Sequence, residues 1–501
     1  MNELSDFEMG TDSPSFDERP KVIFSEESNM HYRADSIDLL VEQSFKLLKR
    51  MIAHHYEHQV PRLKILKSYA EADNTDVMRC RQRRDPLKAD HRASHNYGRY
   101  ISDFITGYLC GMPIKIDSKN DDVKAMIDEI NQSSEVDAHH SEIERELSRY
   151  GRAYELIYHD STKLDKVVLS DVMETFVIYD TGIDLEPIAS VRYPRISFGR
   201  NKEKTCVTLC TDTEIIYFKE TSLKKIVLEV DRAYQHGYGY VPIVEFFNNR
   251  ERRGDYEDVL TQIDLYDAAQ SDTANYMTDL VDAMLVISGD LAESNLTPEN
   301  VRKQRDANTL LLQSGISPDK KQTNTTAQYL YKQYDVSGVE AYKNRLSKDI
   351  HKFTCTPDLT DENFSGIQSG EAMKYKIFGL DQMRAIKERF FTKGIMTRCK
   401  MIANLRVNLN KMPESALEDV DEITCTFTPN LPKDIAAELA AFTSAGGEIS
   451  NRELLKTLSF VKDVDEELAN IEDERLGSLP RTDTDYLTTS RTIAGTEDGS
   501  G

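Results

Sequence analysis

Three residues near the N-terminus, His54, Glu57 and His58, have the types and spacing of the H-x-x-E-H zinc motif. On a helix the two histidines would share one face and bind the metal, with the glutamate beside them as general base. One hypothesis is therefore a zinc-dependent hydrolase. However, we expect Pro61 to end this helix almost at once, and so short a pattern arises readily by chance. Surface histidines are the favoured interpretation.

Other catalytic motifs are missing from the sequence. It contains no G-x-x-x-x-G-K-[ST] loop, no G-x-G-x-x-G, no G-x-S-x-G and no D-x-D-x-D-G calcium loop. We therefore expect a protein that is not an enzyme, has no catalytic or metal-binding residue and needs no cofactor.

Composition describes a large acidic protein. The 501 residues carry a net charge of −23, and the length allows two to four domains. No apolar stretch approaches the ~18 residues of a membrane span, so no membrane contact is expected. The seven cysteines show no C-x-x-C spacing, which fits a reducing cytoplasm. The charge argues against a protein that reads DNA sequence, but it is compatible with one that lets DNA slide past.

The most informative stretch is the run from Asp255 to Asp282. It holds eight carboxylates and no Lys, Arg, Gly or Pro, and its apolar residues recur every three or four positions. This predicts one uninterrupted helix about 42 Å long. Such an acidic helix is either a solvated outer face or the wall of a channel built from several copies. A basic helix predicted from Ser337 to Phe353 could pack against it antiparallel, with opposite charges side by side within or between subunits.

The remaining pattern predicts an α+β fold. Helices are expected from about Ser36 to Tyr56, from His91 to Cys110, from Asp137 to Tyr150 and from Glu371 to Leu405. Short alternating runs within residues 152–247 predict a sheet. Its expected strands are Tyr154–Tyr158, Val167–Leu169, Thr175–Tyr179, Val207–Cys210, Glu214–Phe218 and Ile226–Val230.

Three segments, in this order, carry a family resemblance. They are DFITGYLCGMP at 103–113, VPIVEFFNN at 241–249 leading into Asp255, and SGIQSGEAMK at 365–374. With the order of predicted elements, they make nearly the whole chain resemble the SPP1-type portal proteins of long-tailed bacteriophages that infect Gram-positive hosts.

The resemblance implies a portal fold with wing, stem, clip and crown domains. Residues 1–36 would be a flexible N-terminal arm, 37–254 the wing, 255–283 the stem helix, 284–335 the clip and 336–353 the returning stem helix. Residues 354–370 would form a tunnel loop and 371–430 a long tunnel or wing helix with a returning strand. Residues 431–476 would be crown helices and 477–501 a disordered tail.

The same resemblance implies a structural head–tail connector in the virion. The family forms a ring, usually of twelve copies, at one capsid vertex, through which double-stranded DNA is packaged and ejected without sequence specificity. Its implied partners are the terminase large subunit, a head–tail adaptor, and the major capsid and scaffolding proteins. Assembly would take place in the host cytoplasm. A scaffold or minor head component is a rival interpretation, which the sheet pattern disfavours.

Residues expected to meet DNA lie in the stem and the tunnel loop. The stem candidates are Lys348, Lys352, Asp264, Asp267, Asp272 and Asp279. The two lysines would face the tunnel or pair with stem acids of a neighbouring copy. The loop candidates are Asp358, Asp361, Glu362, Phe364, Ser365 and Gly366.

Overall fold

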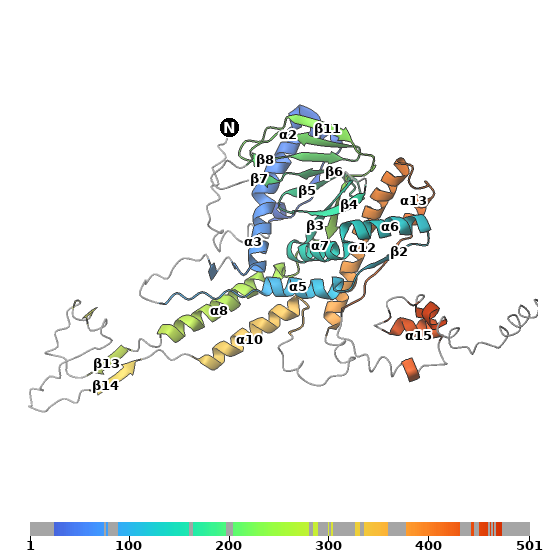
Figure 1. Cartoon of the computed structure of the whole chain (residues 1–501). Coiled ribbons are helices and arrows are strands. Elements are labelled where there is room, and N and C mark those ends of the chain that lie inside the picture. Colours follow the sequence, from blue (N-terminus) through green and yellow to red (C-terminus); the bar gives the residue numbers. More distant parts are fainter. Residues whose placement is uncertain are drawn as a thin grey trace, which may run out of the picture. The chain divides into compact units, whose positions relative to one another are not determined.

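The computed structural model divides the chain into two compact units, Met1–Asn430 and Leu431–Gly501, which are described separately. It describes residues 25–74, 77–78, 89–159, 164–196, 204–279, 284–288, 299, 302–303, 326–330, 335–358, 377–430, 442–444, 450–458, 461, 464 and 467–472. Within these residues the fold mixes helices and sheets, as predicted (Figure 1).

The first long helical segment continues through the predicted stop at Pro61. Helix α2 (Ile37–His54) leads into a π-helical turn, η2 (His55–Gln59), and then into α3 (Val60–Ala70). Pro61 is the second residue of α3, so the wider π-helical turn lies just before the residue that lacks an N–H. The prediction that this proline ends the helix is therefore wrong.

A six-stranded sheet occupies most of the predicted strand region. Its order is β1 (Tyr32–Arg33), β5 (Thr175–Tyr179), β6 (Pro187–Arg192), β9 (Thr208–Thr211), β10 (Glu214–Phe218) and β11 (Val230–Gln235). Strand β1 pairs parallel to β5, and the other pairs are antiparallel. Buried residues of α2, such as Leu40 and Ile52, share a core with Phe176 and Leu209 of the sheet. Because β1 belongs to this sheet, the predicted flexible arm extends too far at its C-terminal end.

A second core lies on a three-stranded sheet ordered β12 (Ile243–Phe247), β3 (Arg152–His159) and β4 (Asp165–Ser170). Helices α6 (Asp121–Ser134), α7 (Val136–Tyr150) and α12 (Phe378–Asn408) contribute to it. α7 ends where predicted, because Gly151 adopts a left-handed conformation at φ 81°. α12 approaches β12 closely, since a Cβ on Gly394 would lie only 2.3 Å from the Phe246 ring. The start of the predicted helix, 371–376, lies outside the described residues.

Two predicted helices begin later than expected. Helix α5 runs over Tyr97–Cys110 rather than from His91, with the Asn96 side chain accepting from the Arg99 amide as its cap. The acidic run opens with a short 3₁₀ turn, η3 (Glu257–Val259), and helix α8 covers Leu260–Asp279. Helix α10 (Val336–Phe353) matches the predicted basic helix closely. Strands β13 (Met284–Ser288) and β14 (Thr326–Leu330) form an antiparallel pair.

The smaller elements complete the two units. Strand β2 (Lys115–Asp117) pairs with β15 (Thr424–Thr426), and β7 (Arg195–Ile196) pairs with β8 (Lys204–Thr205). Helix α13 (Ala416–Val420) packs near α12. In the second unit, helix α15 (Asn451–Thr457) buries Leu454 and Leu455, as expected for a short amphipathic helix. In the described part of the chain, every helix is too short or too polar to span a membrane.

Candidate functional site

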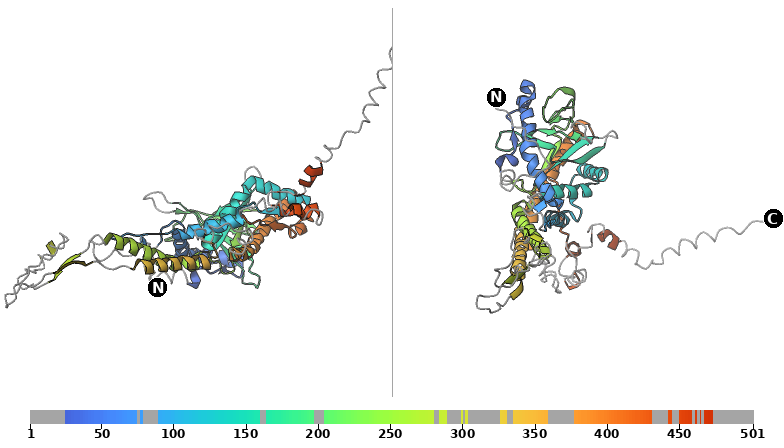
Figure 2. Two further views of the ribbon diagram at one scale, coloured as in Figure 1. Left: turned by 90° about the horizontal axis from the view of Figure 1, so that it is seen from below. Right: turned by 90° about the vertical axis from the view of Figure 1, so that its left-hand side faces the viewer.

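Helices α8 and α10 lie side by side and run away from the sheets of the first unit (Figures 1 and 2). α8 leaves the β12 strand through a short loop, and α10 returns along it toward α5. The Tyr97 hydroxyl of α5 donates to the Ser347 hydroxyl of α10 at 3.3 Å. This helix pair is the candidate functional site, because the residues predicted to meet DNA lie on it or next to it.

One face of α8 is hydrogen-bonded to an extended segment, His91–His95. Side chains four residues apart on the helix, Asp267, Ser271 and Asn275, accept the backbone N–H groups of His95, Ala93 and His91 at 3.0, 2.9 and 2.6 Å. The repeat of the helix thus matches alternate residues of the segment. These bonds explain why residues 91–95 do not join α5, since their amides already have partners on α8.

The predicted stem acids divide into buried and exposed positions. Asp264 accepts from the Tyr69 hydroxyl, and Asp267 accepts from the side chains of Asn74 and His95. Both acids are buried within the chain, at 5% and 0% exposure. Asp272 is exposed on α8, and Asp279 is described only as the last residue of that helix. The structure therefore places Asp264 and Asp267 away from any surface that DNA could touch in this conformation.

Helix α10 contacts α8 through a lysine and an amide. Lys343 is buried, and its Nζ donates to Gln270 Oε1 of α8 at 2.9 Å. Leu346 and Ile350 are buried on the same helix. The sequence predicts that acids of α8 lie beside bases of α10. Within the chain this contact instead joins a lysine to an amide, and the buried acids Asp264 and Asp267 are hydrogen-bonded to other elements. Lys348 and Lys352 are both exposed, and Lys352 lies 5.7 Å from the Phe353 ring centre.

A buried lysine, Lys387, is hydrogen-bonded to the loop that precedes α8. Lys387 of α12 donates to Glu144 Oε1 of α7 and to Asp255 Oδ2, both at 2.8 Å, and also to Asn248. Burial raises the pKa of Glu144 to about 7 although Lys387 opposes the shift. Burial alone would lower the pKa of Lys387, but Asp255 and Glu144 outweigh it and raise that pKa. One cation therefore lies between two carboxylates, and the remaining negative charge favours the protonated form of Glu144.

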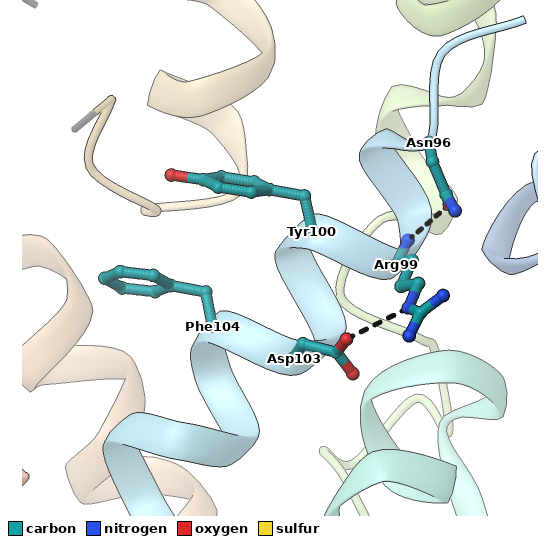
Figure 3. Close-up of a pocket in the computed structure, with 5 residues that line it drawn as sticks. All are labelled: Asn96, Arg99, Tyr100, Asp103 and Phe104. Atoms are coloured by element: carbon teal, nitrogen blue, oxygen red, sulfur yellow. Dashed lines mark hydrogen bonds and ion pairs between the residues drawn. The ribbon is translucent and has the colours of Figure 1, made fainter. Parts of the chain in front are cut away.

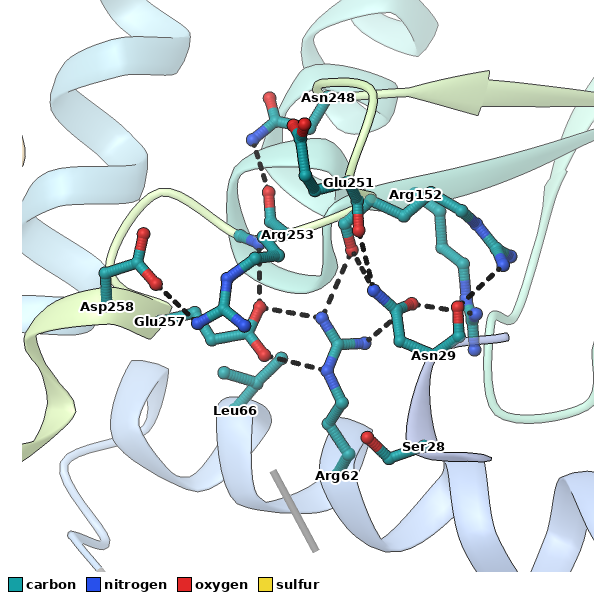
Figure 4. Close-up of polar contacts among 12 residues, drawn as sticks. Ser28, Asn29, Arg62, Leu66, Arg152, Asn248, Glu251, Arg253, Glu257 and Asp258 are labelled. Carbon is teal, nitrogen blue, oxygen red and sulfur yellow. Dashed lines mark hydrogen bonds and ion pairs between the residues drawn. The ribbon is translucent and has the colours of Figure 1, made fainter. Parts of the chain in front are cut away.

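A second buried ion pair holds η3, directly before α8 (Figure 4). Arg62 of α3 donates two parallel hydrogen bonds to Glu257, from Nε to Oε1 at 2.8 Å and from Nη2 to Oε2 at 2.7 Å. Both side chains are at most 1% exposed. The Gly254 amide also donates to Glu257, at 3.0 Å. Such a two-bond pair fixes orientation as well as distance, so the start of α8 is held rigidly against α3.

The predicted tunnel loop is described only at its beginning. Asp358 is partly buried, whereas Asp361, Glu362, Phe364, Ser365 and Gly366 lie outside the described residues. The Tyr100 hydroxyl of α5 donates to the Pro357 carbonyl at 3.1 Å and so anchors the start of the loop. Beside it is a shallow surface hollow lined by Asn96, Arg99, Tyr100, Asp103 and Phe104 (Figure 3). Arg99 and Asp103, one turn apart on α5, form an ion pair at 3.2 Å.

The histidine motif folds differently from the predicted hydrolase site. His54 and His58 do share a face, with ring centres 4.5 Å apart. Among the described residues, however, the carboxylate grouped with them is Glu27 and not Glu57, which is exposed. The Tyr32 hydroxyl hydrogen-bonds His54 Nδ1 at 2.9 Å. Burial and the neighbouring His58 lower the pKa of His54.

Little in the sequence indicates which residues anchor the start of α8. Arg62 and Lys387 read as ordinary charged positions on amphipathic helices, yet both are buried. The usable signal was weak: each stands among apolar residues of its helix, Leu63 and Ile65 in one case and Phe390 and Phe391 in the other. Their partners lie 195 and 132 residues away in the chain, so spacing could not connect them.

Comparisons of sequence with known proteins agree on one class. A family model described as "Phage portal protein, SPP1 Gp6-like" matches residues 49–478. The portal protein of Bacillus phage SPP1 is 23% identical over 408 residues, covering 78% of this chain and 77% of the relative. The portal protein of Clostridium phage phiCD119 is 23% identical over 412 residues, covering 77% and 86%. Among solved structures, the neck of an empty gene transfer agent particle aligns with 12% identity and a TM-score of 0.37, covering 72% of this chain and 89% of that chain.

The matches define the chain as a phage portal protein, a structural head–tail connector found in the virion. Within that class it belongs to the SPP1 Gp6-like portal family, because the family model spans most of its length. The resemblance inferred from the three sequence segments is confirmed.

Proposed function

We propose that the chain assembles into a homo-oligomeric ring, most simply of twelve copies, at one vertex of the capsid. Double-stranded DNA would enter and leave through the ring without sequence-specific contacts. The ring would dock the terminase large subunit during packaging and a head–tail adaptor afterwards, and it would contact the major capsid and scaffolding proteins. Assembly would take place in the host cytoplasm.

The observation that carries this proposal is that buried ion pairs anchor the start of α8, the first helix of the α8–α10 pair. A helix pair that lines a channel must keep its position while DNA moves past it. Here the start of α8 is fixed by the buried Lys387 cluster and by the Arg62–Glu257 pair. In this assignment α8 and α10 are the stem, the sheets with α2 to α7 and α12 are the wing, and β13–β14 belongs to the clip. The tunnel loop would begin after α10, and the second unit would contain the crown.

Electron microscopy shows directly whether a protein forms rings, so it tests this proposal. The purified full-length chain should form closed rings with a central hole in negative-stain images. Light scattering should give the mass of a dodecamer, about 690 kDa from twelve chains of 57.2 kDa. Monomers alone, over a range of salt and protein concentration, would contradict the proposal.

The charge of the channel wall provides a second prediction. We propose that Asp272 and Asp279 of α8 face the channel, and that Lys348 and Lys352 supply cations farther along the wall, toward the end of α10 that lies by the start of α8. Asp264 and Asp267 drop out of this set because they are buried. Carboxylates on the wall would repel phosphates and keep DNA from adhering.

Replacing Asp272 by Lys changes the charge of a twelve-copy wall by 24. We expect packaging to slow at least about twofold at low ionic strength and to recover toward the wild-type rate as salt screens the wall. A packaging assay with purified rings and terminase measures this. The matched control is Asp231→Lys, the same change on the exposed strand β11. Equal rates for both variants at low salt would show that the Asp272 position does not face DNA.

A further inference from the structure

The group formed by Glu27, His54 and His58 lies far from the helix pair in the chain and has no part in the function proposed above. It combines two imidazoles and one carboxylate from two separate elements, the 3₁₀ turn η1 (Glu26–Ser28) and the helical segment α2–η2. Their possible ligand atoms all lie within 4.8 Å of one another. We propose that these three residues bind a divalent transition metal, with zinc as the best match.

The donor set determines the class of metal. Two histidines and a carboxylate suit zinc and its neighbours among the transition metals, whereas calcium and magnesium prefer oxygen ligands alone. Bonds of about 2.0–2.1 Å place tetrahedral ligand atoms about 3.3 Å apart. His58 Nδ1 and Glu27 Oε2 are already 3.3 Å apart. The remaining separations can close through rotation of the exposed His58 and Glu27 side chains.

Backbone hydrogen bonds fix both elements that carry the three residues, η2 and η1. In η2 the Val60 N–H donates to the His55 carbonyl, five residues back, which is the π-helical pattern often found at functional sites. In η1, Ser25 caps the turn by accepting the Glu27 amide at 3.3 Å. The Tyr32 hydroxyl at His54 Nδ1 fixes that ring and leaves Nε2 for the metal.

A hydrogen bond beside the group already joins the two elements, since Gln59, next to His58, donates to the Met30 carbonyl at 2.9 Å. Asn29, directly after η1, donates to the Glu251 carbonyl at 2.8 Å, which ties the turn to the loop before η3. The ligands therefore need little reorganisation. A bound metal would cross-link the turn η1 to the helical segment α2–η2. Three protein ligands leave one position for water. Glu57 takes no part, so the site lacks the general base of the H-x-x-E-H arrangement and its role is structural.

Zinc binding to the intact chain tests the proposal. Protein stripped with a chelator should bind one Zn²⁺ per chain in titrations against a chromophoric competitor. His58→Ala and Glu27→Gln should each weaken the zinc affinity at least about tenfold. Mutation of a residue that only hydrogen-bonds to a metal ligand already weakens metal binding by that much. Both side chains are about half exposed, so neither change should unfold the protein. Circular dichroism of each variant verifies this.

The matched control is Glu57→Gln, which removes a neighbouring carboxylate outside the group. It should bind zinc as the wild type does. Amide hydrogen exchange gives a second measurement: zinc should slow exchange at Ser28 and Asn29, whose N–H groups close the η1 turn, in wild type and Glu57→Gln but not in Glu27→Gln.

Three results would overturn the proposal. The first is no stoichiometric zinc binding. The second is equal affinity in wild type and Glu27→Gln, which would indicate adventitious binding by some of the eleven histidines. The third is loss of binding in Glu57→Gln with Glu27→Gln unaffected, which would place the metal on the helical motif alone.

Discussion

Replacing Lys387 by Met should lower the free energy of unfolding of the first unit by about 3–5 kcal/mol. The substitution keeps most of the side-chain volume but leaves Glu144 and Asp255 buried without their cation. The loss is measured as the shift of the urea midpoint multiplied by the slope of the transition. Protein concentration must be held fixed, since assembly would itself stabilise the folded chain.

The pH dependence of this loss follows from the same cluster. In the wild type the pKa of Glu144 is raised to about 7, and it must rise further once Lys387 is gone. A carboxyl whose folded pKa is raised stabilises the fold below its unfolded pKa, and this contribution is lost as pH rises through the folded pKa. The deficit of Lys387→Met should therefore be larger at pH 8 than at pH 5. Lys393→Met, an exposed change on the same helix, should stay within about 0.5 kcal/mol at both values. A deficit independent of pH would argue against the buried charges as its cause.

Replacing Arg62 by Met should cost a similar amount, about 3–5 kcal/mol. Glu257 would keep the Gly254 amide but lose both guanidinium bonds in a site closed to water. Because this pair holds η3 and the first turn of α8, the variant should also form fewer closed rings. Urea denaturation and negative-stain counts measure the two effects.

Two further variants separate the ion pair from its surroundings. Lys67→Met, on the same helix, removes only an exposed pair with Glu71 at 3.8 Å and should change stability by less than about 1 kcal/mol. The double variant Arg62→Met with Glu257→Met replaces both charges by apolar groups and should recover most of the loss. If the double variant is as unstable as Arg62→Met alone, packing around Arg62, rather than the orphaned carboxylate, is responsible.

Local patterns predicted the fold where one face of an element is buried. The strands at Thr175–Tyr179 and Glu214–Phe218 match β5 and β10 residue for residue, and the basic helix matches α10 within one residue. Strand β11 lies later than the predicted strand Ile226–Val230, because all six of its residues are exposed and show no alternation. Local pattern also does not predict the late start of α5, since it depends on hydrogen bonds to a helix more than 170 residues away.

The candidate site was harder to predict than the fold. The acidic run correctly predicts a long helix, but the sequence predicts its charges to be solvated or channel-facing. Instead, Asp255, Glu257, Asp264 and Asp267 each contact a partner far along the chain. A sequence shows how many charges a helix carries. It does not show which of them have a buried partner, because that depends on tertiary packing.

The hydrogen bonds between α8 and residues 91–95 have a mechanical consequence. Four helical residues advance about 6.0 Å and two extended residues about 6.6 Å, so such bonds stay in register for only a few repeats. The three described here accumulate a mismatch of about 1.2 Å over two repeats. A force along the axis of α8 strains all three together in shear, whereas a sideways force peels them apart one at a time. In the proposed ring, drag from DNA moving along α8 would act in the direction in which this attachment is strongest.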